Sequence, residues 1–355
     1  MQIDMHFYAV YALCRLAGIH SIHAQTIAYA SQFVDDQVKG INLIFRKCQK
    51  ALRPVLTSHK PLDYQNAIND DQWRVWTAFH FLPGNQSKRG IFEEKMICRK
   101  NSELANRVME HAIQNCHQPS DLFGVGMAAH SFADTFAHYG FIGISTEWNK
   151  VKDETIHIKN RRKTIGLYIK EKFASFKGRA AELIPIGHGA VATFPDRPYL
   201  KWEFQYERNK RKVERHDNPA DYLQASALLY GYFCRMLEAN SWLGDGTTTV
   251  PWSRCERSIS TLICNEAKKN GRVKAWKKFI KGGAYFATDQ QDAKVHYLEG
   301  KWNTTVSQRK RADESQVRDL PLYHFMKAAQ DQIELVSNYL VEVGITFPTN
   351  GGILK

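Results

Sequence analysis

Residues 120–139 carry the strongest helical pattern in the chain, and three polar side chains interrupt its apolar surface at a fixed interval. The segment follows Pro119 and contains His130, Asp134 and His138, each four residues from the next. Because residues four apart share one face of an α-helix, a helix here presents three metal-capable side chains together. The alternative is a buried helix whose histidines bond to backbone carbonyls or to Asp134 without a metal.

Apolar residues at three-and-four spacing predict helices along most of the chain, whereas strand-like alternation is scarce. The predicted helices are 6–19, 21–38, 71–81, 101–116, 120–139, 220–239, 259–280 and 322–343. Residues 185–202 contain Gly187, Gly189, Pro195 and Pro198, which predict an ordered loop that presents side chains. The sequence therefore predicts an all-α, multi-helix bundle.

The chain is long enough for one large domain with an elaborated C-terminal part. We expect a metal-binding helical domain over residues 1–240 and a basic helical extension over 241–355 that packs on it. A hydrophobic fraction of 43% is typical of globular proteins and excludes extensive disorder.

The chain shows no feature of membrane insertion or secretion. Its first residues lack the basic and apolar blocks of a signal peptide, and no run of about 18 apolar residues is present. The seven cysteines form no CxxC pair, and an odd number fits a reducing compartment. These features predict a cytoplasmic protein.

Further candidate metal ligands lie outside residues 120–139. Asp4 and His6 begin the chain, Asp35 and Asp36 end an otherwise apolar helix, and His80 follows an aromatic segment. A buried His beside aromatic rings needs a partner for each ring nitrogen, and a metal with a neighbouring acceptor supplies both. In the Gly/Pro-rich segment the candidates are His188 and Asp196, although Asp196 equally suits a turn-capping residue.

The net charge of +13 indicates attraction to polyanions without identifying one. Residues 273–281 combine apolar Val273, Trp276, Phe279 and Ile280 with lysines at 274, 277, 278 and 281. This helix suits an anionic membrane surface or nucleic-acid phosphates, and residues 161–163 and 210–212 add charge to either case. An ordinary helix with its lysines in solvent is the alternative.

Several strings resemble a bacterial family that we relate to the zinc-dependent phospholipase C and fungal single-strand nuclease superfamily. They are IDMHFYAVYALCRLAGI, AYASQFVDD, FHFLPG, AAHSFADTFAHYGF and IGHGAVATFPDRPYLKW. The resemblance implies a helical cleft with two or three zinc ions. It places His6 on one ion, Asp35 or Asp36 with His80 and His130 on a second, and Asp134 between two ions. It places His138, His188 and Asp196 on the third.

The chain departs from the superfamily in three ways. The superfamily uses a processed N-terminal Trp as a zinc ligand, whereas this chain begins with Met1, and Asp4 is our candidate for the missing oxygen ligand. The gap between Asp134 and His138 is shorter than in the superfamily, and Asp196 follows His188 at a greater distance.

The resemblance implies a metal-dependent phosphodiesterase that hydrolyses a phospholipid headgroup or a nucleic acid. Asp35 or Asp36 is the candidate general base, and Arg197 is the candidate phosphate-binding residue. The alternative is a non-catalytic, metal-stabilised module that binds phosphorylated ligands or a partner protein, within a toxin or defence system. The absence of GxSxG, P-loop and GxGxxG motifs argues against serine hydrolases and nucleotide-cofactor enzymes.

Overall fold

The computed structural model describes most of the chain. The described residues are 1–40, 43–45, 50–52, 54–60, 69–84, 90–159, 162–180, 186–209, 212–246, 248–303 and 313–345.

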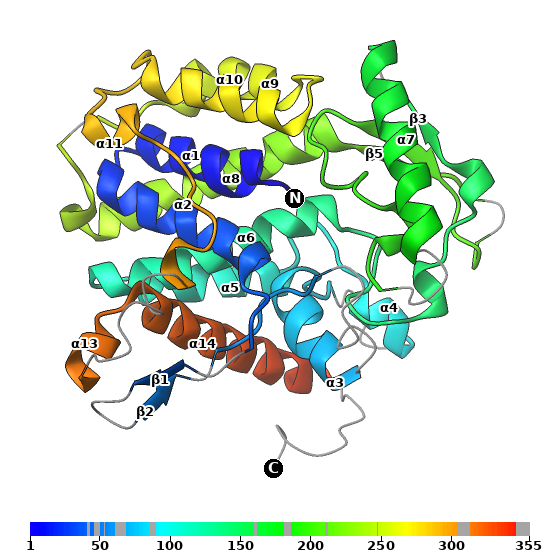
Figure 1. Ribbon diagram of the computed structural model, residues 1–355, viewed down its shortest axis with the longest axis horizontal. Helices are drawn as coiled ribbons and strands as arrows, with labels where there is room; N and C mark the ends of the chain where they lie inside the picture. Colours follow the sequence, from blue (N-terminus) through cyan, green and yellow to red (C-terminus); the bar gives the residue numbers. More distant parts are fainter. Residues whose placement is uncertain are drawn as a thin grey trace.

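Helix α6 (Leu122–Ala137) occupies the centre of the fold, and every residue in it except Gly124 is buried. It packs against four long helices that come from distant parts of the sequence (Figure 1). These are α2 (Ser21–Asp36), α5 (Glu103–Gln114), α8 (Asn218–Ala239) and α14 (Pro321–Glu342). A polar side chain on α6 is therefore held inside the protein, where it needs a partner.

A glycine on α6 lets α2 approach closely. A Cβ atom at Gly126 would lie 2.2 Å from the backbone oxygen of Ile27 and 2.7 Å from the Cβ of Ala30. Any larger residue at this position would force the two helices apart. This contact brings the C-terminal end of α2, where Asp35 lies, towards the polar face of α6.

The N-terminus forms a buried helical segment in two parts. A π-helix, η1 (Asp4–Ala9), continues into α1 (Val10–Ala17), which ends at Gly18 with φ 95°. This left-handed conformation suits glycine and turns the chain into α2. Segment η1 packs against α2 and against α10 (Lys269–Lys281), so His6 lies inside the bundle.

The structure corrects the all-α prediction, because a small antiparallel sheet packs beside the bundle. Its order is β3 (His157–Ile158), β4 (Lys201–Phe204) and β5 (Glu214–Asp217). Trp202 and Phe204 on β4 are buried, whereas Lys201, the first residue of the strand, is exposed. Alternation over only four residues beside a Gly/Pro-rich loop is too short to predict a strand. A separate hairpin pairs β1 (Leu43–Phe45) with β2 (Lys50–Leu52).

The predicted helix 259–280 is wrong as one element, because it is divided into α9 (Trp252–Ile263) and α10 (Lys269–Lys281). Ile259 and Ile263 are buried on α9, and Trp276 and Ile280 are buried on α10. At 3.6 residues per turn, a continuous helix would rotate the second apolar stripe by about 100° from the first. The break allows both stripes to face the core.

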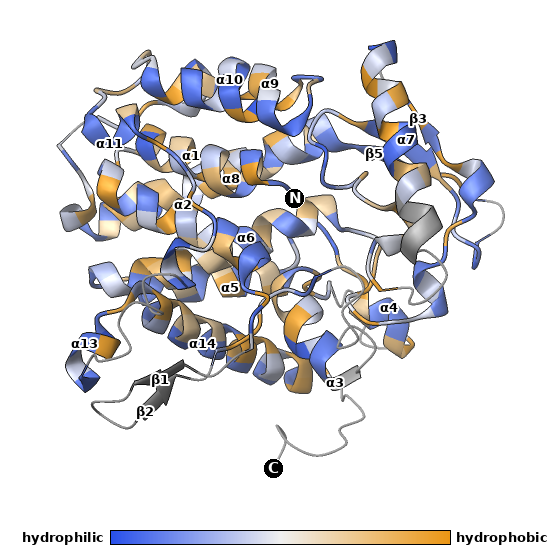
Figure 2. Ribbon diagram, viewed as in Figure 1, coloured by the Kyte–Doolittle hydropathy of each residue, from blue (hydrophilic) through white to orange (hydrophobic). Residues whose placement is uncertain are grey.

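The remaining elements are short, apart from α7 (Lys163–Ala180), which the sequence did not predict. They are α3 (Asn69–Gln72), η3 (Trp73–Thr77), α4 (Phe92–Met96), η4 (Pro119–Asp121), η5 (Glu147–Asn149), η6 (Asp153–Thr155), η7 (Gly189–Val191), η8 (Ser241–Leu243), α11 (Gln290–Ala293) and α13 (Glu314–Arg318). Apolar residues line the inner sides of the long helices and hydrophilic residues their outer sides (Figure 2).

The C-terminal part shares its core with the N-terminal helices. A continuous cluster of buried apolar residues extends from Met1 to Ile345, and a second cluster, which includes Trp202 and Phe204, lies at the sheet. A buried arginine on α1, Arg15, also forms ion pairs with Asp245 at 2.6 Å and Asp292 at 3.1 Å. None of the described helices is apolar over a stretch long enough to cross a bilayer.

Candidate metal centre

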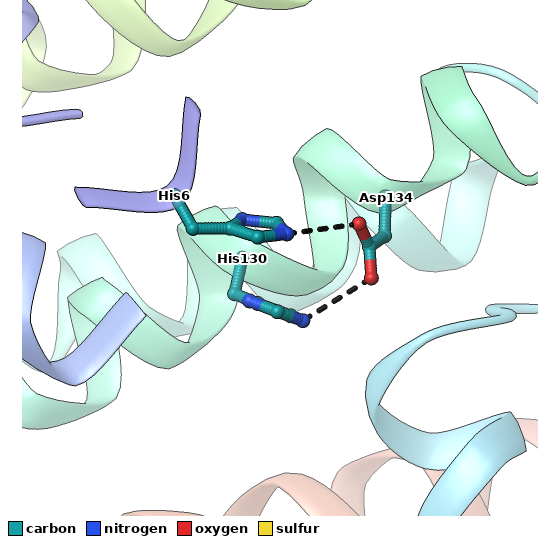
Figure 3. A group of neighbouring side chains, drawn as sticks. All are labelled: His6, His130 and Asp134. Atoms are coloured by element: carbon teal, nitrogen blue, oxygen red, sulfur yellow. Dashed lines mark ion pairs between the residues drawn. The ribbon is translucent and has the colours of Figure 1, made fainter. Parts of the chain in front are cut away.

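Asp134, on helix α6, lies at the middle of a buried polar cluster with His6 of η1 and with His80, which follows η3. Its Oδ2 atom lies 3.1 Å from Nε2 of His130, one turn earlier on α6, and 3.0 Å from Nδ1 of His80. Its Oδ1 atom lies 3.1 Å from Nε2 of His6 (Figure 3). All four side chains are 0–3% exposed, so these charged or chargeable groups interact without solvent screening.

His6 reaches this cluster because η1 packs on α2 and α10 beside α6. Its ring stacks on the ring of His130, with centroids 3.8 Å apart and planes 22° apart. Among the described residues, neither ring nitrogen of His6 has a hydrogen-bond partner with good geometry. A fully buried imidazole without such partners is costly unless a metal ion takes the lone pair.

His80 is oriented by a backbone carbonyl. Its Nε2 atom lies 2.8 Å from the carbonyl oxygen of Thr57, so Nε2 carries the proton and donates it. In the neutral ring, Nδ1 then carries a lone pair, and it faces Oδ2 of Asp134 and Nε2 of His130 at 3.0 and 3.2 Å. Oδ1 of Asp35, at the end of α2, lies 4.0 Å from the same nitrogen.

A second group lies where α6 meets the Gly/Pro-rich loop. Nε2 of His138 lies 3.2 Å from Oδ1 of Asp196, and Nε2 of His188 lies 3.7 Å from the same oxygen. The other ring nitrogen of each histidine donates to a carbonyl: His138 to His80 at 2.8 Å and His188 to Ala192 at 2.7 Å. Both rings therefore present a bare Nε2 to the carboxylate of Asp196.

This arrangement places lone pairs opposite lone pairs at several points. Bare imidazole nitrogens and carboxylate oxygens repel one another at 3.0–3.7 Å unless a proton or a cation lies between them. Carbonyl-oriented histidines facing carboxylates are also typical of metal centres. Within the described ranges, three groups have ligand atoms within 4.8 Å of one another and can hold metal ions. They are His6, His130 and Asp134; Asp35, His80 and His130; and His138, His188 and Asp196.

Burial favours the uncharged imidazoles that metal ions require. It lowers the pKa of His6 to about 3 and that of His188 to about 4, and it also lowers the pKa of His130. For His80, burial acts in the same direction, but the carboxylates of Asp134 and Asp35 raise its pKa above the ordinary value. Burial alone would raise the pKa of Asp134, yet its interactions with His138 and with the α-amino group of Met1 hold it well below its usual range.

The α-amino group of Met1 lies between the cluster around Asp134 and the group that contains Asp196. It lies 2.7 Å from Oδ1 of Asp134 and 3.3 Å from Oδ1 of Asp196. These carboxylates outweigh the opposing effect of burial and raise the pKa of the amine to about 11.

Three of the predicted site residues point elsewhere. Asp4, the candidate replacement ligand, forms a buried ion pair with Arg272, with Nε and Oδ2 2.6 Å apart, because it lies two residues from His6 and on the other side of η1. Asp36 accepts a hydrogen bond from the hydroxyl of Tyr297. Neither Asp4 nor Asp36 belongs to the three groups found among the described residues.

The third is Arg197, the candidate phosphate-binding residue. Its side chain is buried and donates to Oγ1 of Thr193 at 3.0 Å and to the hydroxyl of Tyr199 at 3.5 Å. Its guanidinium also lies 5.5 Å from the ring centroid of Tyr168. Among the described residues it forms no ion pair, so it is a buried cation close to the centre.

Sequence reasoning did not identify the groups that orient the ligands. The carbonyls of Thr57, His80 and Ala192 have no signature in a sequence, because every residue carries one. The sequence does mark one close contact by a glycine, Gly187. Its φ is +53°, and a Cβ atom there would lie 2.2 Å from Cζ of Phe81. The ring of Phe81 in turn stacks on His138, with centroids 4.7 Å apart.

A cavity of about 440 Å³ lies between α5, α6 and α14, and no residue of the three His/Asp groups lines it. Its lining includes His111, Asp121, Lys327 and Asp331, so it contains both signs of charge. It contributes nothing to the His/Asp centre.

The fold and the centre together define a largely helical protein with buried His/Asp groups that can hold metal ions. The chain belongs to the Family of unknown function (DUF6765), which it matches over residues 1–340. No curated protein and no solved structure matches the chain.

Proposed function

We propose that this protein is a zinc-dependent hydrolase of phosphate esters, acting as a phosphodiesterase. The observation that supports the proposal best is the orientation of His80, His138 and His188, each fixed by a carbonyl with its other nitrogen facing a carboxylate. Imidazole nitrogen and carboxylate oxygen are the ligands that zinc takes in catalytic sites. Zinc bound there would lower the pKa of a bound water and polarise the phosphate.

The chain's own residues divide between holding metal and receiving substrate. We assign the nearly or fully buried side chains to metal binding, namely His6, His80, His130, Asp134, His138 and Asp196. Asp35, with 29% of its side chain exposed, and His188, with 18% exposed, lie nearest to solvent. Asp35 therefore both completes one group and is the better placed of the two acids to accept a proton from a water.

The two carboxylates of α2 take different roles in this proposal. Asp36 is held by Tyr297 and contributes negative charge beside Asp35 rather than a ligand atom. Arg197 supports the loop that carries Asp196 and adds positive charge near the centre. A phosphate ester close to the centre would meet that charge, which is favourable for an anionic substrate.

Hydrolysis of bis-p-nitrophenyl phosphate tests the proposal. Purified protein should turn over this diester, lose activity in chelator and regain it with added zinc. Asp134→Asn and His138→Ala should abolish turnover, whereas His111→Ala, an exposed residue of α5, should leave it unchanged. Mass spectrometry on untagged protein should detect bound zinc.

A non-catalytic metal module is the second candidate function. It is supported by the high burial of the ligands, which is typical of metal ions that stabilise folds. Bound zinc together with no diester turnover would favour this module, and turnover unaffected by chelator would refute the hydrolase.

A further inference from the structure

Helices α9 and α10 concentrate the positive charge of the chain on one surface. Residues 252–281 contain nine Lys or Arg residues and two Glu residues. The exposed members of this basic surface are Arg254, Arg257, Lys268, Lys269, Lys274, Lys278 and Lys281. The chain's net charge of +13 is thus unevenly distributed, and more than half of it falls in these 30 residues.

The basic surface lacks the neutralising acids found elsewhere on the protein. On other helices and strands, exposed cations pair with carboxylates, as in Arg107 with Glu103 at 2.8 Å and Arg235 with Glu110 at 2.6 Å. Within the described part of the chain, none of the seven exposed cations of the basic surface forms an ion pair. An unneutralised field of this kind attracts polyanions over a distance of about a Debye length.

The apolar side of α10 is not available to a membrane. Trp276 and Ile280 are 2% and 0% exposed, and Val273 and Phe279 pack against the core. The large apolar side chains that are exposed, such as Leu167 at 61%, lie outside α9 and α10. Insertion of an amphipathic helix requires an exposed apolar face, so the sequence-based expectation of a membrane-binding helix loses its basis.

The basic surface adjoins the metal centre. Helix α10 packs on η1, which carries His6. At its start, Nζ of Lys268 lies 4.8 Å from the ring centroid of Tyr168, and the guanidinium of Arg197 lies 5.5 Å from the same ring. Arg197 directly follows Asp196, so positive charge and an aromatic ring connect the loop of the centre to α10.

We propose that the basic surface binds the phosphate backbone of single-stranded nucleic acid and that the strand's phosphodiesters reach the metal centre. The inference rests on the proposed function for the cleavage, but strand binding is a separate property. Regularly spaced phosphates match a row of lysines without apolar contacts. A single strand fits better than a duplex, because the centre is recessed and its most exposed ligand side chain is only 29% accessible.

The test measures binding of a fluorescent oligothymidylate by anisotropy, in chelator, between about 0.05 and 0.3 M salt. One variant carries Lys274→Gln, Lys278→Gln and Lys281→Gln. The control carries Arg107→Gln, Arg318→Gln and Lys327→Gln, which removes the same charge from α5, α13 and α14. The loss of three phosphate contacts should reduce the slope of log K against log salt by about 2, or about a hundredfold in affinity at 0.1 M.

The outcomes separate the two proposals. Weaker binding by the α10 variant and unchanged binding by the control support the basic surface, even if no diester is hydrolysed. Equal loss in both variants, or no binding of the wild type, overturns it. Binding to vesicles of phosphatidylglycerol and phosphatidylcholine without oligothymidylate binding overturns it in favour of a membrane. Hydrolysis of bis-p-nitrophenyl phosphate reports on the centre independently.

Discussion

Gly124 and Gly126 lie two residues apart on α6, but a methyl group added to each would meet different surroundings. At Gly126 the added Cβ would lie 2.2 Å from the backbone oxygen of Ile27, whereas at Gly124 it would lie 3.9 Å from Ala328. An ordinary contact is about 3.5 Å, so Gly126→Ala requires α2 and α6 to separate by roughly 1 Å.

The two substitutions form a matched pair. Each replaces Gly by Ala inside a helix, which alone stabilises by about 1 kcal/mol, and this contribution cancels in the comparison. Overpacking at Gly126 costs about 1–3 kcal/mol. We therefore expect Gly126→Ala to be less stable than Gly124→Ala by about 1–3 kcal/mol in urea denaturation followed by circular dichroism.

The same shift should weaken metal binding. Separation of α2 from α6 moves Asp35 away from His130. In the wild type, Oδ1 of Asp35 lies 3.9 Å from Nε2 of His130. Zinc titration of the folded variants should give lower affinity for Gly126→Ala and wild-type affinity for Gly124→Ala. If Gly126→Ala matches Gly124→Ala in both stability and zinc affinity, the reasoning from helix contact to site geometry is refuted.

Three further measurements test other parts of the structure. Zinc at about one hundred times its dissociation constant should raise the free energy of unfolding by about 2.7 kcal/mol, and chelator should remove that gain; no change would contradict metal binding. Burial lowers the pKa of His216 to about 3, whereas the ordinary value of 6.5 applies in the unfolded chain. Between pH 6.5 and pH 3 the folded ring is therefore neutral and the unfolded ring is protonated. Stability should therefore fall as pH decreases from about 6.5 towards 3, by about 2 kcal/mol at pH 5 from this group, and His216→Phe should flatten that part of the pH profile. Arg272→Met should cost about 3–5 kcal/mol by leaving Asp4 buried without its partner, and adding Asp4→Leu should recover most of that loss in a double-mutant cycle.

The sequence predicted the helical bundle because the apolar stripes of its long helices are visible in the order of residues. Helical spacing placed His130 and Asp134 one turn apart on α6. The family resemblance implied a group of His138, His188 and Asp196, and the structure brings these three side chains together. The sheet was not predicted because the alternating pattern of its strands is too short. The break between α9 and α10 was not predicted because the apolar spacing of residues 259–280 is also consistent with one helix.

Helical periodicity along the chain determined by itself that His130 and Asp134 share a face, because that relation involves residues only four apart. Only the tertiary structure decided which distant side chains complete the centre. The close approach of α2 and α6 at Gly126 brings Asp35 to the centre. Asp36 instead bonds to Tyr297 and Asp4 to Arg272, and each partner is more than 250 residues away in the sequence. A carboxylate binds the partner that packing brings within reach, and packing depends on the whole fold.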